Sequence, residues 1–203
     1  MQHSDQPFLE LERAKKAVEA MRESASVPEV EDQWKEFLHR IERVWTKSMN
    51  HFGKSPKWPS WHGKYVQLRR KDQLLSYLIN ARGADEHTVA EITEKKSPTL
   101  VFSIGAGGDT AFINELGFNA DGTPVVDFVG DGEVEYTPGK VKALPVSNRG
   151  VKYEAPTIHL SRPIDPENLI DIAEQGLAFY ADFLKAAEEF FVTSTPASSG
   201  KGQ

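Results

Sequence analysis

The sequence contains no cysteine. Without thiols the chain can form no disulfide, no thiolate nucleophile and no cysteine-ligated zinc site. It also lacks any run of 18 apolar residues, and its first residues do not combine a basic stretch with an apolar one. The sequence therefore predicts neither a membrane-spanning helix nor a secretory signal, and we expect a cytoplasmic protein that does not enter a membrane.

Familiar catalytic and metal-binding motifs are missing as well. The sequence has no HExxH zinc motif and no G-x-S-x-G nucleophile elbow, and its six histidines are scattered. The glycine cluster at residues 105–110 is not followed by the lysine of a phosphate-binding loop. Asp121, Asp127 and Asp131 do not have the spacing of an EF-hand. We therefore expect no metal site and no cofactor.

The charge is mildly acidic overall and basic in one short segment. A net charge of −6 argues against a protein that coats nucleic acid with its whole surface. Gly53–Lys71, in contrast, has six Lys or Arg residues and no Asp or Glu, and its two prolines and two glycines predict a loop. Cations interleaved with aromatic rings are typical of single-stranded nucleic-acid binding. The candidate binding residues are Lys57, Trp58, Trp61, Lys64, Arg69 and Arg70; the alternative is a connector whose aromatic residues cover the end of a helical bundle.

Apolar residues recur at spacings of three and four in four segments, which predicts four helices. The first begins at Ser4 or Asp5 and ends near Met21. The second covers Pro28–His51 and has the strongest pattern. The third covers Lys71–Glu94, with Asp72 as its N-cap. The last begins at Asp165-Pro166-Glu167 and ends near residue 192, and its broadly apolar sequence is typical of a helix in a bundle core or at a subunit interface.

Between residues 98 and 160 the periodicity changes to two. Short β-branched runs alternate with turn sequences at hairpin spacing, which predicts an antiparallel meander of five or six strands. The expected fold is thus α+β: a helical bundle of three N-terminal helices and one C-terminal helix with an inserted antiparallel β-meander. The segments are 1–97 and 161–192 for the bundle, 98–160 for the insertion and 193–203 for a disordered tail.

The third predicted helix carries the candidate catalytic residues. Arg82 and Glu86 lie one turn apart on the same stripe as Leu75 and Leu78, so we expect the two charges to be paired and buried together. His87 follows on the edge of this stripe.

The segment from Arg82 to His87 resembles the R-x(4–6)-H motif of the HEPN family of helical-bundle proteins. In this sequence Gly83 stands where the family commonly has a polar residue, and the resemblance covers the helical half of the chain. It implies a homodimer in which two copies of the motif face a shared cleft. It also implies RNA cleavage without a metal, in which His87 transfers a proton and Arg82 holds the phosphate. In this hypothesis the neighbouring carboxylate of Glu86 or Asp85 orients the two residues.

Three functions follow as hypotheses. The first is a metal-independent endoribonuclease or RNA-binding protein of HEPN-like type, acting as a homodimer. The alternative is a non-enzymatic interaction or dimerisation protein in which Arg82 and Glu86 form a structural ion pair and the sheet binds a partner. The third is a small-molecule binding protein with a pocket between sheet and bundle, for which the sequence has no motif.

Overall fold

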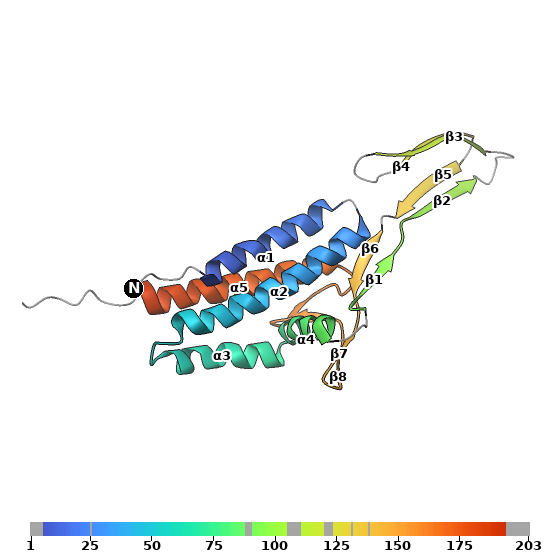
Figure 1. Cartoon of the computed structure of the whole chain (residues 1–203). Coiled ribbons are helices and arrows are strands. Elements are labelled where there is room, and N and C mark those ends of the chain that lie inside the picture. Colours follow the sequence, from blue (N-terminus) through green and yellow to red (C-terminus); the bar gives the residue numbers. More distant parts are fainter. Residues whose placement is uncertain are drawn as a thin grey trace, which may run out of the picture.

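The chain folds into a helical bundle from which a β-structured arm projects (Figure 1). The structure is a computed structural model and describes residues 6–24, 26–87, 91–104, 111–119, 124–130, 132–137 and 139–193. Its helices are α1 (Gln6–Glu23), α2 (Val27–Phe52), α3 (Trp58–Lys71), α4 (Gln73–His87) and α5 (Leu169–Glu188), and a single π-helical turn, η1 (Glu189–Thr193), ends the described chain. None of these helices is long and apolar enough to span a bilayer.

The centre of the bundle is α2. The Ser26 hydroxyl caps it by accepting a hydrogen bond from the Glu29 backbone N–H, and Pro28 lies in its first turn, where a missing N–H costs nothing. Its apolar stripe is buried, as the sequence predicts: Trp34, Phe37, Leu38, Ile41, Val44 and Trp45. Helix α5, capped by Asn168, returns to lie beside α1 and α2 (Figure 1). The predicted return of the last helix to the bundle is therefore confirmed.

The prediction of a loop over Gly53–Lys71 is wrong, because residues 58–71 form helix α3. Pro59 lies in the first turn, where proline is compatible with a helix, and the single interior glycine, Gly63, costs only about 1 kcal/mol. Trp58, His62 and Arg69 share its buried face. The bundle consequently has four N-terminal helices rather than three.

Helix α4 is shorter than predicted. Asp72 caps it as expected, since its Oδ1 accepts a hydrogen bond from the Leu75 backbone N–H at 3.0 Å. The helix ends at His87, and a strand begins at Thr93, so the predicted helical end near Glu94 is wrong. The competing interaction is pairing of residues 93–96 with a strand more than forty residues later in the chain, which local periodicity does not report.

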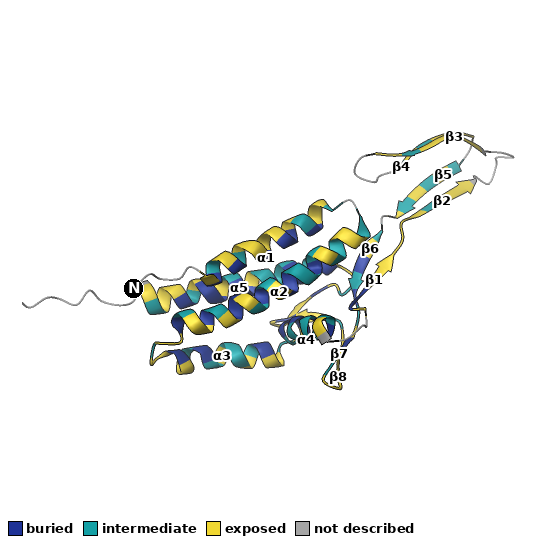
Figure 2. Ribbon diagram, in the orientation of Figure 1, coloured by how far each residue is buried: buried dark blue, intermediate teal, exposed yellow. Residues whose placement is uncertain are grey.

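The β insertion is a succession of antiparallel pairs. Strand β1 (Thr93–Lys96) pairs with β6 (Lys140–Ala143), β2 (Thr99–Ile104) with β5 (Gly132–Thr137), and β3 (Ala111–Phe118) with β4 (Pro124–Gly130). Residues 97–139, which contain β2 to β5, are called the arm from here on. The arm extends away from the bundle, and its described surface is mostly exposed or half-buried (Figure 2).

Two small hairpins pack on α4. Strands β7 (Val146–Asn148) and β8 (Val151–Tyr153) are joined by a turn in which Arg149 and Gly150 both have positive φ. Strands β9 (Ile158–His159) and β10 (Arg162–Pro163) form the second hairpin. The α+β class with an antiparallel insertion is confirmed, although the strands form five separate pairs rather than one continuous sheet.

The second hairpin is fastened to the start of α4 by side chains. The Asp72 carboxylate lies 2.8 Å from His159 Nδ1 and also accepts a hydrogen bond from the Leu160 backbone N–H. Gln73 Oε1 accepts hydrogen bonds from the backbone N–H groups of Thr157 and Ile158. The residue that starts α4 therefore also fixes this hairpin.

Candidate functional site

The predicted pair of Arg82 and Glu86 forms on α4. Arg82 Nη2 donates to Glu86 Oε1 at 2.5 Å, and His39 Nδ1 lies 3.5 Å from the same carboxylate oxygen. The pair is only partly buried: the Arg82 side chain is 33% exposed and the Glu86 side chain 27%. The two charges are therefore paired as predicted, but they are half-buried rather than buried. Residue 87 ends α4, and the His87 side chain lies outside the described part of the structure.

Arg82 faces a cavity of about 410 Å³ between α4 and the β7–β8 hairpin. The Asn148 side chain enters the space beside Gly83, where a Cβ would approach its Nδ2 to 2.5 Å, and it donates to Asn80 Oδ1 at 3.0 Å. A Cβ at residue 83 would therefore displace the Asn148 amide from its present position beside the helix. Arg149 also lines the cavity, and the Arg82 Nε is buried without a hydrogen-bond partner among the described residues. Two guanidinium groups and two amides can bind a small oxyanion, although the Glu42 carboxylate also lines the cavity and opposes an anion there.

The predicted nucleic-acid residues divide into buried and exposed sets. Trp58 and Arg69 are buried, so their side chains are not placed to contact a nucleic acid. Lys57, Lys64 and Arg70 are exposed. The remaining residue of the predicted set, Trp61, is half-buried against Phe183 and the rings of η1. This arrangement of rings agrees with the alternative prediction, in which the aromatic residues cover the end of the bundle.

Arg69 belongs to a buried polar cluster. Its Nε donates to the Tyr180 hydroxyl at 3.0 Å, its Nη2 binds the Glu42 carboxylate, and its guanidinium lies 4.0 Å from the centre of the Trp45 ring. Burial raises the pKa of Tyr180 to about 12. The neighbouring His62 is stacked between Trp45 and Trp58, and burial, followed by the charge of Arg69, lowers the pKa of its imidazole. The cluster joins α2, α3 and α5.

A second cluster surrounds Glu10, whose side chain is fully buried. Its carboxylate contacts four cations from α1 and α2: Arg13 at 3.1 Å, Arg40 at 2.9 Å, Arg43 at 3.2 Å and Lys47 at 2.5 Å. Burial alone would raise the pKa of Glu10, but the hydrogen bonds from Lys47 and Arg40 outweigh it and lower the pKa to about 2. One carboxylate thus holds together cations that otherwise repel one another.

The arm combines exposed apolar side chains with negative charge. Phe112 is 64% exposed and Phe118 66%, and other large apolar residues of the arm are also exposed: Val101, Phe102, Ile113, Leu116, Val125 and Val129. Between Lys96 and Lys140 the sequence has no Lys or Arg and seven acidic residues: Asp109, Glu115, Asp121, Asp127, Asp131, Glu133 and Glu135. No sequence motif indicates this surface. The signal that could have indicated it is the absence of Lys and Arg over more than forty residues.

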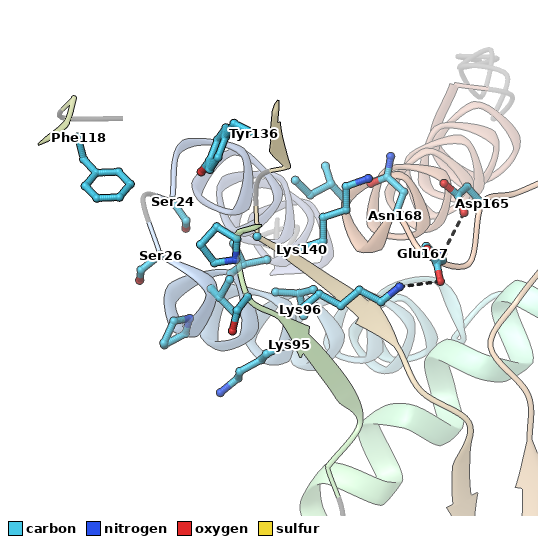
Figure 3. A pocket seen from close by; sticks show the side chains of 18 residues that line it. Ser24, Ser26, Lys95, Lys96, Phe118, Tyr136, Lys140, Asp165, Glu167 and Asn168 are labelled. Carbon is cyan, nitrogen blue, oxygen red and sulfur yellow. Dashed lines mark hydrogen bonds and ion pairs between the residues drawn. The ribbon is translucent and has the colours of Figure 1, made fainter. Parts of the chain in front are cut away.

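A larger cavity, of about 840 Å³, lies where the arm joins the bundle (Figure 3). The starts of α2 and α5 and the strands β1 and β6 line it. Lys96 Nζ contacts Glu167 Oε1 at 3.1 Å, and Lys95 Nζ contacts Glu31 Oε2 at 2.6 Å, a hydrogen bond that raises the pKa of Lys95. This cavity matches the position expected for a small-molecule pocket between sheet and bundle, but two of its three lysines already have carboxylate partners.

Within the described ranges, no group of three or more His, Asp or Glu side chains is arranged to hold a metal ion. No protein-family model matches the chain, and neither the curated proteins nor the solved structures searched give a match.

Proposed function

We propose that the chain is a non-enzymatic interaction protein in which the helical bundle is a rigid base and the arm binds a protein partner. The observation that carries the proposal is the exposed apolar surface of the arm in a segment that has seven carboxylates and no cation. Exposed Phe112 and Val129 face each other across the β3–β4 ladder, and exposed apolar side chains that lie together mark interaction surfaces. The surrounding carboxylates select a partner surface that presents Lys and Arg around apolar residues.

The residues of α4 support the same proposal. Glu86 accepts a hydrogen bond from Arg82 and lies near His39 of α2, and Lys35 of α2 lies 3.6 Å from Asp85. These contacts join α4 to α2, so they fix the position of α4 along α2 in the bundle. In this interpretation Arg82 and Glu86 form a structural ion pair.

Removal of the arm gives a direct test, and we expect the bundle to stay folded because β6, the strand that contacts α2 and α5, is retained. Lys96 and Lys140 are directly paired at the end of the β1–β6 ladder, so an Asn-Gly turn in place of residues 97–139 closes this ladder as a hairpin. We expect the full chain to bind a fluorescent synthetic amphipathic helix of Lys and Leu residues, and the armless variant to bind it about tenfold more weakly or not at all. Fluorescence anisotropy measures both affinities.

Point variants separate apolar contact from charge in the same assay. The double variant Phe112→Ser, Phe118→Ser should weaken binding of the Lys/Leu helix, whereas Ile158→Ser, an exposed apolar residue outside the arm, should leave it unchanged. Equal affinities of the full chain and the armless variant would contradict the proposal.

RNA binding or cleavage at the α4 cavity is a second candidate function. It is favoured by the Arg82 Nε, which has no hydrogen-bond partner among the described residues, and by Arg149 beside it. In this candidate a homodimer would cleave RNA without a metal, with His87 moving the proton and Arg82 holding the phosphate.

An RNA-cleavage assay in EDTA separates the two candidates. The interaction proposal predicts no cleavage by the full chain and an effect of Arg82→Ala on thermal stability alone, because Glu86 loses its partner. Cleavage that persists in EDTA and disappears in His87→Ala, with an unchanged melting temperature, would establish the ribonuclease instead.

A further inference from the structure

The charges of the chain are separated into two blocks. Between Glu42 and Asp72 the sequence has eight cations and no Asp or Glu: Arg43, Lys47, Lys54, Lys57, Lys64, Arg69, Arg70 and Lys71. The arm has the opposite composition, with seven acidic residues and no Lys or Arg. The rest of the chain carries both signs. Along the sequence, each block therefore carries charged side chains of one sign only.

The arm and the turn between α2 and α3, which lies in the middle of the cationic block, are at opposite ends of the molecule. The turn between α2 and α3 is at the end of the bundle that also holds the start of α1 and the end of α5, and the arm extends from the other end (Figure 1). Arg43 and Lys47 share the Glu10 carboxylate with two further cations, and Arg69 is paired with Glu42. Of the other five cations, Lys54, Lys57 and Lys64 lie in the turn between α2 and α3 or in the first half of α3, and they form no ion pair with any described residue. Arg70 and Lys71 lie at the far end of α3. The end of the bundle that holds these three lysines, together with Glu188 and Glu189 at the end of α5, is called the basic end from here on.

Apolar side chains accompany the charge at both ends. At the basic end Leu9, Met49, Phe190 and Val192 are exposed, and Lys64 Nζ lies 4.8 Å from the centre of the Tyr65 ring. On the arm the exposed Phe112 and Phe118 lie on the same strand as Glu115. Both surfaces thus present apolar groups bordered by charge, with opposite signs.

We propose, on the basis of the function proposed above, that the partner of the arm is the basic end of a second copy of this chain. Two arms would repel each other, because each carries seven carboxylates and no cation. The contact is therefore between arm and basic end. Two copies lying antiparallel make both such contacts at once, which closes the assembly as a two-fold symmetric dimer.

Charge exchange between the two surfaces tests this arrangement. The first variant carries Glu115→Lys, Asp127→Lys, Glu133→Lys and Glu135→Lys, which changes the net charge of its arm from −7 to +1, so that its arm and its basic end are both positive. The second carries Lys54→Glu, Lys57→Glu and Lys64→Glu, so that both of its surfaces are negative. All seven side chains are exposed, and the folding of each variant is checked by its melting temperature.

Sedimentation equilibrium at low ionic strength gives the decisive masses. We expect the wild type to sediment as a dimer of the 22.7 kDa chain, each variant alone as a monomer, and their equimolar mixture again as a dimer. The dimer should dissociate about tenfold more readily at 1 M salt, where the Debye length falls to about 3 Å. A mixture that remains monomeric, or a wild type that is monomeric, overturns the proposal.

The assay with the Lys/Leu helix shows whether a negative result rejects only the second copy as partner or also the proposed function of the arm. A monomeric wild type that still binds this helix through its arm retains the proposed function and rejects the second copy as partner. A monomeric wild type that does not bind the helix rejects both.

Discussion

Replacing Arg69 by Ala should lower the melting temperature by about 6–12 °C. The substitution leaves the Tyr180 hydroxyl and the Glu42 carboxylate without their guanidinium partner and removes the cation that lies against the Trp45 ring. Loss of one partner from a buried charged cluster costs about 3 kcal/mol, and a chain of this size loses about 2–4 °C for each kcal/mol.

Arg70 provides the matched control for this prediction. It is the same residue type one position later on α3, but its side chain is exposed. Arg70→Ala should therefore change the melting temperature by less than about 1–2 °C, since isolated surface charges contribute little. Similar melting temperatures for the two variants, measured by circular dichroism, would show that Arg69 does not hold the three helices together.

Replacing Glu10 by Gln should destabilise the fold by about 2–3 kcal/mol at neutral pH. The amide keeps the size of the side chain but leaves Arg13, Arg40, Arg43 and Lys47 without their shared counter-charge. The cations are partly exposed, so solvent screens part of their mutual repulsion and the effect falls below that of a fully buried ion pair. Glu12→Gln, an exposed neighbour on the same helix, should have little effect.

The pH dependence of this difference has a defined sign. The pKa of Glu10 is lowered from 4.5 to about 2 in the folded chain, so its stabilising effect is complete above pH 4.5 and is lost as the pH falls towards 2. The free energies of unfolding of wild type and Glu10→Gln, from urea titrations, should therefore converge between these values. A difference that stays constant down to pH 2 would show that the carboxylate charge is not what stabilises the cluster.

Sequence periodicity predicts those parts of the fold that depend on local pattern. The stripe of α2 and the return of α5 follow from apolar spacing, and the pairing of Arg82 with Glu86 follows from their separation of one helical turn. Pro59 is interpreted as a helix breaker, whereas it occupies the first turn of α3, where proline is tolerated.

Contacts between distant segments could not be predicted in the same way. The four cations around Glu10 come from two helices, and Arg69 meets Tyr180 more than one hundred residues away. Such contacts depend on how the helices pack against one another, which the apolar pattern of one helix does not determine. The opposite charges of the arm and of residues 43–71, in contrast, can be found by counting charged residues along the sequence.

Hydrogen exchange of the arm amides tests most directly whether the arm is the binding element. Exchange is followed by mass spectrometry for residues 99–104, 111–118, 124–130 and 132–137, first at a concentration where the chain is monomeric and then with saturating Lys/Leu helix. We predict slower exchange in the arm on binding and unchanged exchange in α2 and α5. Slower exchange confined to the bundle, with the arm unaffected, would contradict the central claim.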